Sequence, residues 1–161
     1  MMLQSKRAAD TMTIGRKLAK KLRAGDIILF SGDLGAGKTT MIQGIAQGLG
    51  VEEPVTSPSF TLMNQYEGEQ VLYHFDLYRL DSIEDLWELG LEEFLYDNGI
   101  SVVEWSEKLM EFPEAHLQIN LALDMDDPDS RRISLTPVGA YYEQLLLDYG
   151  QEVKAYEITG Y

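Results

Sequence analysis

The chain has 161 residues, a length typical of one domain, and its 27 acidic and 13 basic residues give a formal net charge of −14. This charge argues against a protein that binds a nucleic-acid backbone or an anionic membrane surface directly, because both need a basic face. The chain has no cysteine and is 45% apolar, which excludes thiol chemistry and disulfide scaffolds and fits a globular protein of the reducing cytoplasm.

Alternating helices and strands are predicted for the first half of the chain. Residues 11–23 carry apolar side chains at steps of four, the pattern of an amphipathic helix. Residues 26–30 are almost wholly apolar, which is typical of a strand buried on both faces. A glycine-rich turn leads into a helix over residues 38–49. Residues 61–66 and 70–78 then predict an antiparallel hairpin.

The second half is predicted to contain short helices, a buried strand, a hairpin and a terminal helix. In chain order these cover residues 82–89 and 91–96 (helical), 100–104 (buried strand), 115–124 with 131–136 (hairpin), and 139–149 (helix). Residues 151–161 give no clear pattern. Together the elements predict an α/β sandwich with a mixed sheet.

Residues 32–39, with the sequence GDLGAGKT, match the phosphate-loop pattern in full. Glycines let the backbone turn its N–H groups inward around an anion, and the following helix adds its positive end. Lys38 places a charge on the terminal phosphates, and Thr39 offers a hydroxyl to magnesium. The expected nucleotide-binding residues here are Asp33, Leu34, Gly35, Ala36, Gly37, Lys38, Thr39 and Thr40.

This motif between a buried strand and a helix refines the predicted fold. We expect residues 1–161 to form a single P-loop nucleotide-binding domain, which the family resemblance described below makes a P-loop ATPase domain. Its architecture would be a P-loop NTPase-type three-layer sandwich, with a mixed, mainly parallel sheet and antiparallel hairpin additions.

Two carboxylates are candidates to serve the nucleotide. Glu104 ends the buried strand 100–104, where a carboxylate can reach magnesium, although Asp is the usual residue and an ordinary strand-end Glu is the alternative. Asp76 shares one strand face with His74 and Tyr78 and could orient a water molecule. A salt bridge from Asp76 to Arg79 is the alternative, and a zinc site with His74 is not favoured.

Hydroxyl and arginine side chains give three further candidates. The segment 56–60 contains Ser59 and could sense the γ-phosphate as switch loops do, or it could be an ordinary Ser/Pro turn. Arg131 and Arg132 could pair with the acidic turn 124–129 or stack on a nucleotide base, and their spacing leaves both open. That acidic turn lacks the glycine and the final glutamate of a calcium-binding loop.

Taken together, these segments resemble the TsaE family, the bacterial ATPases that assist threonylcarbamoyladenosine modification of transfer RNA. The matching pieces cover residues 32–40, 56–60, 74–80 and 103–105, with Thr11 and Gly15 upstream. The order and spacing of the four segments make the resemblance specific.

The resemblance implies ATP binding, weak ATP hydrolysis and dependence on Mg²⁺. It assigns Thr39 and Glu104 to the metal and Asp76 to the catalytic face, so the expected catalytic residues are Asp76, Lys38 and Glu104. It also implies that Thr11 and Arg132 approach the base. Ser59 stands where the family has Thr, which preserves the hydroxyl. TsaD and TsaB homologues are the implied partners.

The leading interpretation is therefore a magnesium-dependent ATPase that binds and resets a TsaD–TsaB complex. Two alternatives stay open: a small-molecule or nucleotide kinase, and a nucleotide-gated interaction module with negligible hydrolysis. A kinase would need an arginine-bearing lid, which six arginines make hard to place. A GTPase is disfavoured because the sequence has no Asn-Lys-x-Asp segment.

Overall fold

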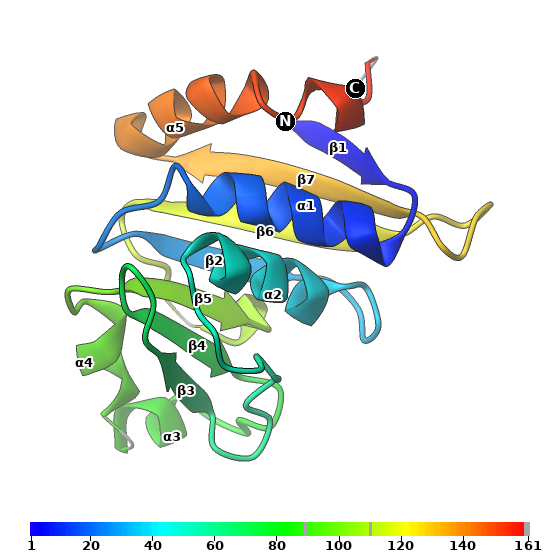
Figure 1. The fold of residues 1–161 in the computed structure, drawn as a ribbon. Coiled ribbons are helices and arrows are strands. Elements are labelled where there is room, and N and C mark those ends of the chain that lie inside the picture. The colour runs from blue at the N-terminus through cyan, green and yellow to red at the C-terminus, as the bar shows by residue number, and fades with distance from the viewer. Residues whose placement is uncertain (89, 110, 160–161) are drawn as a thin grey trace.

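The fold is a mixed seven-stranded sheet with helices on both faces, seen in a computed structural model that describes residues 1–88, 90–109 and 111–159 (Figure 1). The strands are β1 (Met2–Ser5), β2 (Ile27–Ser31), β3 (Met63–Tyr66), β4 (Leu72–Asp76), β5 (Ile100–Glu104), β6 (His116–Leu123) and β7 (Arg131–Val138). The helices are α1 (Ala8–Ala19), α2 (Lys38–Gly48), α3 (Ile83–Glu88), α4 (Leu91–Leu95) and α5 (Ala140–Gly150), with 3₁₀ turns η1 (Ser106–Lys108) and η2 (Lys154–Tyr156).

The sheet order is β1-β7-β6-β2-β5-β4-β3, and its four central strands are parallel. The outer strands pair antiparallel: β3 with β4, β7 with β6, and β1 with β7. All five residues of β4 and of β5 are buried, as expected for strands covered on both faces. The predicted α/β sandwich, with its parallel centre and antiparallel additions, is confirmed.

Each face of the sheet has its own apolar core. On one face, Ile28 and Phe30 of β2 pack in a cluster with apolar residues of α1, α2 and α5. On the other face, Leu29 and Val103 pack with Leu95 of α4. Figure 1 shows α1 and α2 side by side across the first face. Three layers therefore hold the carboxyl ends of the central strands in fixed positions.

The two helices of the first face approach each other through glycines. A Cβ atom on Gly44 of α2 would lie 2.1 Å from the carbonyl oxygen of Met12, and one on Gly15 of α1 would lie 2.3 Å from that of Met41. Ordinary van der Waals contact begins at about 3.4 Å, so no side chain fits at either position. This close crossing brings the start of α1 beside the P-loop.

The observed elements differ from the predicted ones mainly at the N-terminus. Helix α1 begins at Ala8 rather than residue 11, because the Asp10 carboxylate accepts a hydrogen bond from the Lys6 amide and closes the first turn. It ends at Ala19 rather than residue 23, and Leu22 is buried in the following turn. Strand β1 was not predicted, since four residues are too few to show alternation.

The rest of the chain follows the predicted order. The hairpins β3–β4 and β6–β7, strand β5 and helix α5 lie within a few residues of their expected bounds. Leu89, part of the helix predicted over 82–89, lies outside the described residues. In the segment after α5, Glu157 forms a β-bridge with Leu3, which ties the two ends of the chain together. No helix among the described residues is long and apolar enough to cross a membrane.

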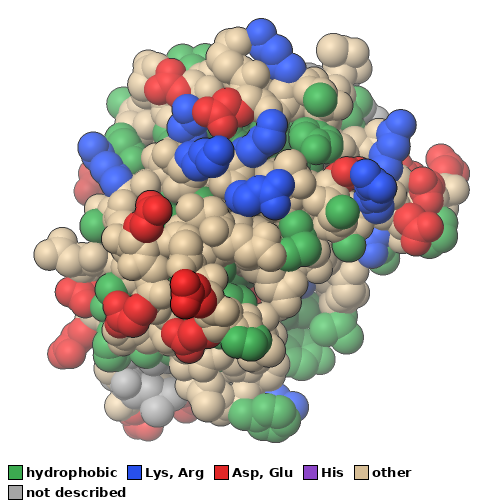
Figure 2. All heavy atoms as spheres, in the orientation of Figure 1, with side chains coloured by type: hydrophobic (Ala, Val, Ile, Leu, Met, Phe, Trp, Pro, Cys, Tyr) green, Lys and Arg blue, Asp and Glu red, His purple; other side chains and the backbone are tan. Residues whose placement is uncertain are grey.

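The charges are unevenly spread over the surface. Figure 2 shows most of the Lys and Arg side chains of this view in its upper half, with Asp and Glu side chains both among them and in the lower half. Two cations hold the segment that follows α5: Lys21 forms an ion pair with Glu152 at 2.6 Å, and Lys17 donates to the Glu152 carbonyl at 2.8 Å.

Candidate functional site

A cleft of about 380 Å³ lies where the parallel strands β2, β4 and β5 end. Open α/β sheets bind ligands at this edge, outside the carboxyl ends of their strands. The cleft is lined by Leu34, Gly35, Gly37, Lys38, Thr39, Thr40, Ser57, Ser59, Asp76, Tyr78, Arg79, Glu104 and Trp105. The P-loop, the 56–60 loop and the ends of β4 and β5 therefore meet in one hollow.

The P-loop turns directly into α2 through Gly37, whose φ of 102° is a left-handed conformation that favours glycine. No side chain among the described residues caps this end of α2. The N–H groups of its first turn are therefore available to an anion, and the helix dipole adds positive potential there.

Lys38 is 4% exposed and its ammonium group is folded back onto the P-loop. It donates to the carbonyl oxygens of Gly32 and, at 3.0 Å, Asp33, and it lies 4.3 Å from the centre of the Trp105 ring. Burial lowers the pKa of Lys38, while nearby carboxylates, Glu104 foremost, act in the opposite direction. A phosphate in the cleft would give this ammonium group a charged partner in place of carbonyls.

Glu104 is the centre of a short hydrogen-bonded chain. The Thr39 hydroxyl donates to its Oε1 atom at 2.9 Å, and the His74 ring nitrogen Nε2 lies 2.7 Å from its Oε2 atom. Glu104 is 3% exposed and His74 is fully buried. In the parallel register of β4 and β5, Asp76 lies directly beside Glu104, so the two predicted carboxylates are neighbours.

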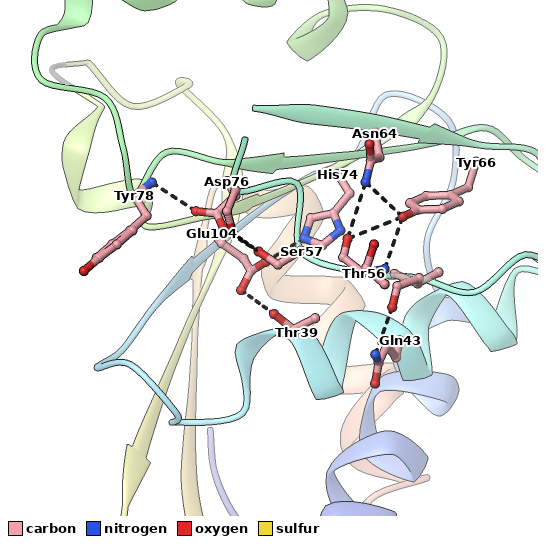
Figure 3. A network of polar contacts seen from close by, with 12 residues as sticks. Thr39, Gln43, Thr56, Ser57, Asn64, Tyr66, His74, Asp76, Tyr78 and Glu104 are labelled. Carbon is pink, nitrogen blue, oxygen red and sulfur yellow. Dashed lines mark hydrogen bonds and ion pairs between the residues drawn. The ribbon is translucent and has the colours of Figure 1, made fainter. Parts of the chain in front are cut away.

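The Asp76 carboxylate is hydrogen-bonded to the 56–60 loop (Figure 3). Its Oδ2 atom accepts hydrogen bonds from the hydroxyls of Ser57 and, at 3.5 Å, Ser59, and its Oδ1 atom accepts the Tyr78 amide at 3.0 Å. Arg79 instead lies over the Phe60 ring, 4.2 Å from its centre. Within the described residues, the alternative salt bridge between Asp76 and Arg79 does not form.

The 56–60 loop is fixed at its start and exposed at its end. The Gln43 side chain of α2 donates to the Val55 carbonyl at 2.9 Å, and the Tyr66 hydroxyl accepts the Thr56 amide at 3.3 Å (Figure 3). Phe60, by contrast, is 83% exposed. Ser57 and Ser59 lie between these ends, and both line the cleft.

The donor set suits a magnesium ion shared with phosphate better than a metal held by protein alone. Among the described residues no group of three or more His, Asp or Glu could hold a metal. Magnesium is usually bound by one or two protein oxygens together with water and substrate phosphates, and Thr39 with Glu104 offers such a pair. In the acidic turn, Asp124 pairs with Arg132 at 3.7 Å, and the Asp127 carboxylate accepts the Ser130 hydroxyl at 2.7 Å.

A second hollow, of about 90 Å³, also borders the P-loop. It is lined by Ala8, Thr11, Gly35, Gly37, Thr40, Asp129 and Arg131. Thr11, which the resemblance assigns to the base, lines this hollow together with P-loop residues. The arginine at this hollow is Arg131, whose guanidinium donates to the Gly35 carbonyl at 3.4 Å, and not Arg132, which extends toward Asp124.

Most predicted site residues come together at these two hollows. Asp33 and Ala36 belong to the P-loop but line neither hollow: the Asp33 carbonyl binds Lys38, and Ala36 is buried against the core. The lining residues absent from the predicted set are Ser57, Tyr78, Arg79, Trp105, Ala8, Asp129 and Arg131. Four of these, Ser57, Tyr78, Arg79 and Trp105, lie within the matched segments 56–60, 74–80 and 103–105. Membership of those segments could therefore have identified them as site residues.

Comparison with known proteins identifies the family. Residues 5–133 match the family model described as "Threonylcarbamoyl adenosine biosynthesis protein TsaE". The chain is 42% identical over 123 residues to the tRNA threonylcarbamoyladenosine biosynthesis protein TsaE of Treponema pallidum, covering 76% of this chain and 91% of that protein. It is 40% identical over 138 residues to the Bacillus subtilis protein of the same name, covering 84% and 85%.

The fold agrees with this assignment. The crystal structure of Bacillus subtilis YdiB superimposes with a TM-score of 0.82 and 34% sequence identity, covering 94% of this chain and 95% of that one. With its matched segments gathered around one P-loop cleft, the chain belongs to the TsaE family of tRNA threonylcarbamoyladenosine biosynthesis proteins.

Proposed function

We propose that this protein, as one domain over residues 1–161, is a magnesium-dependent ATPase that supports threonylcarbamoyladenosine modification of tRNA. It would bind and reset a complex of TsaD and TsaB homologues through ATP binding and hydrolysis. The observation that carries the proposal is the cleft in which Lys38, Thr39, Glu104 and Asp76 converge.

Each of these residues has a distinct task in the proposal. The first turn of α2 and the Lys38 ammonium group bind the phosphates of ATP. Thr39 and Glu104 would hold Mg²⁺, whose positive charge would offset the negative charge of the phosphates. Asp76 orients the attacking water, because its carboxylate lies beside Glu104 and can accept a hydrogen bond from that water. Thr11 and Arg131 line the second hollow, which would receive the base.

The 56–60 loop is the proposed link between nucleotide and partner. In this structure the hydroxyls of Ser57 and Ser59 bond Asp76. A γ-phosphate would compete for these hydroxyls, and their release would move the exposed Phe60 end of the loop. Binding and loss of the terminal phosphate would thereby change a surface that a partner can recognise.

RNA contact is assigned to the partners in this proposal. The net charge of −14 disfavours strong binding of this chain to a phosphate backbone. Two of its thirteen basic residues, Lys17 and Lys21, already hold Glu152.

Isothermal titration of ATP in the presence of Mg²⁺ tests the proposal first. Lys38→Ala should weaken ATP binding strongly, because it removes the charge beside the phosphates, whereas Lys20→Ala, at an exposed position outside the cleft, should not. Binding of the TsaD–TsaB pair should then differ between the ATP-bound and nucleotide-free protein. The proposal fails if ATP does not bind, or if it leaves the affinity for that pair unchanged.

Reconstituted tRNA modification separates an ATPase from a gated interaction module. The ATPase predicts that repeated modification cycles need hydrolysable ATP, and that a non-hydrolysable analogue supports binding but not turnover. Equal modification with ATP and with the analogue would favour the module with negligible hydrolysis. Phosphoryl transfer to a nucleoside or sugar acceptor would instead favour the kinase.

A further inference from the structure

His74 is buried in the site but has no task in the mechanism above. It lies on β4 two residues before Asp76, with its side chain fully buried. Its Nε2 atom lies 2.7 Å from Oε2 of Glu104, whose other oxygen accepts the Thr39 hydroxyl at 2.9 Å. Both oxygens of the Glu104 carboxylate are therefore held, one from each side (Figure 3).

The direction of the hydrogen bond follows from the acceptor. As a magnesium ligand Glu104 would be ionised, and an ionised carboxylate only accepts hydrogen bonds, so the proton between the two groups then belongs to His74 Nε2. The other ring nitrogen, Nδ1, is buried and has no hydrogen-bond partner among the described residues. The arrangement fits a ring whose Nε2–H donates this hydrogen bond.

We propose that His74 is a positioning residue for Glu104 and, through it, for magnesium; this rests on the proposed function. Glu has one more rotatable bond than the Asp that usually serves P-loop magnesium, so its carboxylate has more orientations to lose on binding. The His74 hydrogen bond fixes Oε2 and leaves Oε1 directed at Thr39. Groups that orient a metal-binding carboxylate in this way typically contribute about 10- to 100-fold to metal affinity.

The test compares two substitutions of His74 by the dependence of ATP affinity on Mg²⁺. His74→Leu removes the donor with little change in bulk, whereas His74→Gln can place an amide N–H near the position of Nε2. We expect His74→Leu to weaken the Mg²⁺-dependent part of ATP binding by about 10- to 100-fold. Affinity measured in EDTA should stay unchanged, and His74→Gln should recover most of the loss.

His116 is the matched control. It is the only other histidine of the chain, is also buried, and lies at the start of β6 outside the cleft. Its Nδ1 atom lies 2.8 Å from the Pro113 carbonyl and must donate to it, so its proton sits on the opposite nitrogen from that of His74. His116→Gln should leave the Mg²⁺ dependence as in the wild type.

Nitrogen NMR of the two imidazole rings tests the arrangement without any substitution. His74 should be protonated at Nε2 and His116 at Nδ1 in the nucleotide-free protein. A His74 ring that carries its only proton on Nδ1 would overturn the proposal, because Nε2 could then not donate to Glu104. A His74→Leu variant with wild-type Mg²⁺ dependence would also overturn it. Should His74→Leu fail to fold, His74→Gln and the NMR result decide. If the wild type itself binds no Mg²⁺-ATP, the proposed function fails, and the NMR result alone tests the hydrogen bond.

Discussion

Gly44→Ala should destabilise the protein by separating α1 from α2. The added Cβ would lie 2.1 Å from the Met12 carbonyl oxygen and 2.9 Å from the Met12 Cα atom. Ordinary contact begins at about 3.4 Å, so the two helices would have to move apart by about 1.3 Å at this point. The obstructing atoms are backbone, and no change of side-chain rotamer can relieve the clash.

The expected loss is about 2 kcal/mol in the free energy of unfolding. Overpacking a core costs about 1–3 kcal/mol, and backbone obstruction places Gly44 at the upper end. Alanine returns about 1 kcal/mol because it favours a helix interior more than glycine does. For a chain of this length the net loss corresponds to a melting temperature lower by roughly 4–8 °C.

Urea and thermal unfolding followed by circular dichroism measure this loss. Gly150→Ala is the control, because Gly150 is also helical and its new Cβ would meet only the flexible end of the Met1 side chain, at 3.0 Å. That variant should be as stable as the wild type or slightly more stable. A loss below about 0.5 kcal/mol for Gly44→Ala, or an equal loss in both variants, would refute the argument from close helix packing.

Three further outcomes can be measured on the same protein. Asp76→Asn should lower the rate of ATP-dependent phosphate release by at least about 100-fold while calorimetry shows ATP affinity largely retained; an unchanged rate would make Asp76 structural. Tyr142→Phe should lower the free energy of unfolding by about 1–3 kcal/mol in urea, because the buried Ile27 amide loses its acceptor at 2.9 Å. Burial raises the pKa of Tyr141 and of Tyr142 to about 12, above the ordinary value of 10. The folded state therefore favours the neutral phenols, and the free energy of unfolding should be highest below pH 10 and fall as pH rises toward 12. Tyr142→Phe should make this fall shallower, and an equally steep fall would contradict the role of Tyr142.

Much of the site could be predicted because its signals are local. A phosphate loop is a continuous segment. The strand before it and the helix after it can both be predicted from residues 26–49 alone. The position of Glu104 at the end of an apolar strand is likewise a local feature, and β5 ends at this residue. Local propensity and hydrophobic period decide such features without knowledge of the partner strands.

The pairing of strands decided the rest. From the sequence alone, Asp76 could either form a salt bridge with Arg79 or serve the nucleotide. The parallel register of β4 with β5 puts it beside Glu104, where the 56–60 loop supplies its hydrogen bonds. The contact of His74 with Glu104 has the same origin, since 30 residues separate the two in the chain. Non-local contacts of this kind depend on register, which no single segment contains.

Arg131 and Arg132 show most directly what only the tertiary structure decides. Neighbouring residues of a strand point to opposite faces, so the sequence by itself determines that just one of the two can face the P-loop. Which one depends on how β7 pairs with β6 and β1, where Leu123 lies opposite Arg131 and Ala122 opposite Arg132. That register directs Arg131 to Gly35 and Arg132 to Asp124. The sequence thus determines the chemical groups and their alternation, and strand pairing determines which of them meet.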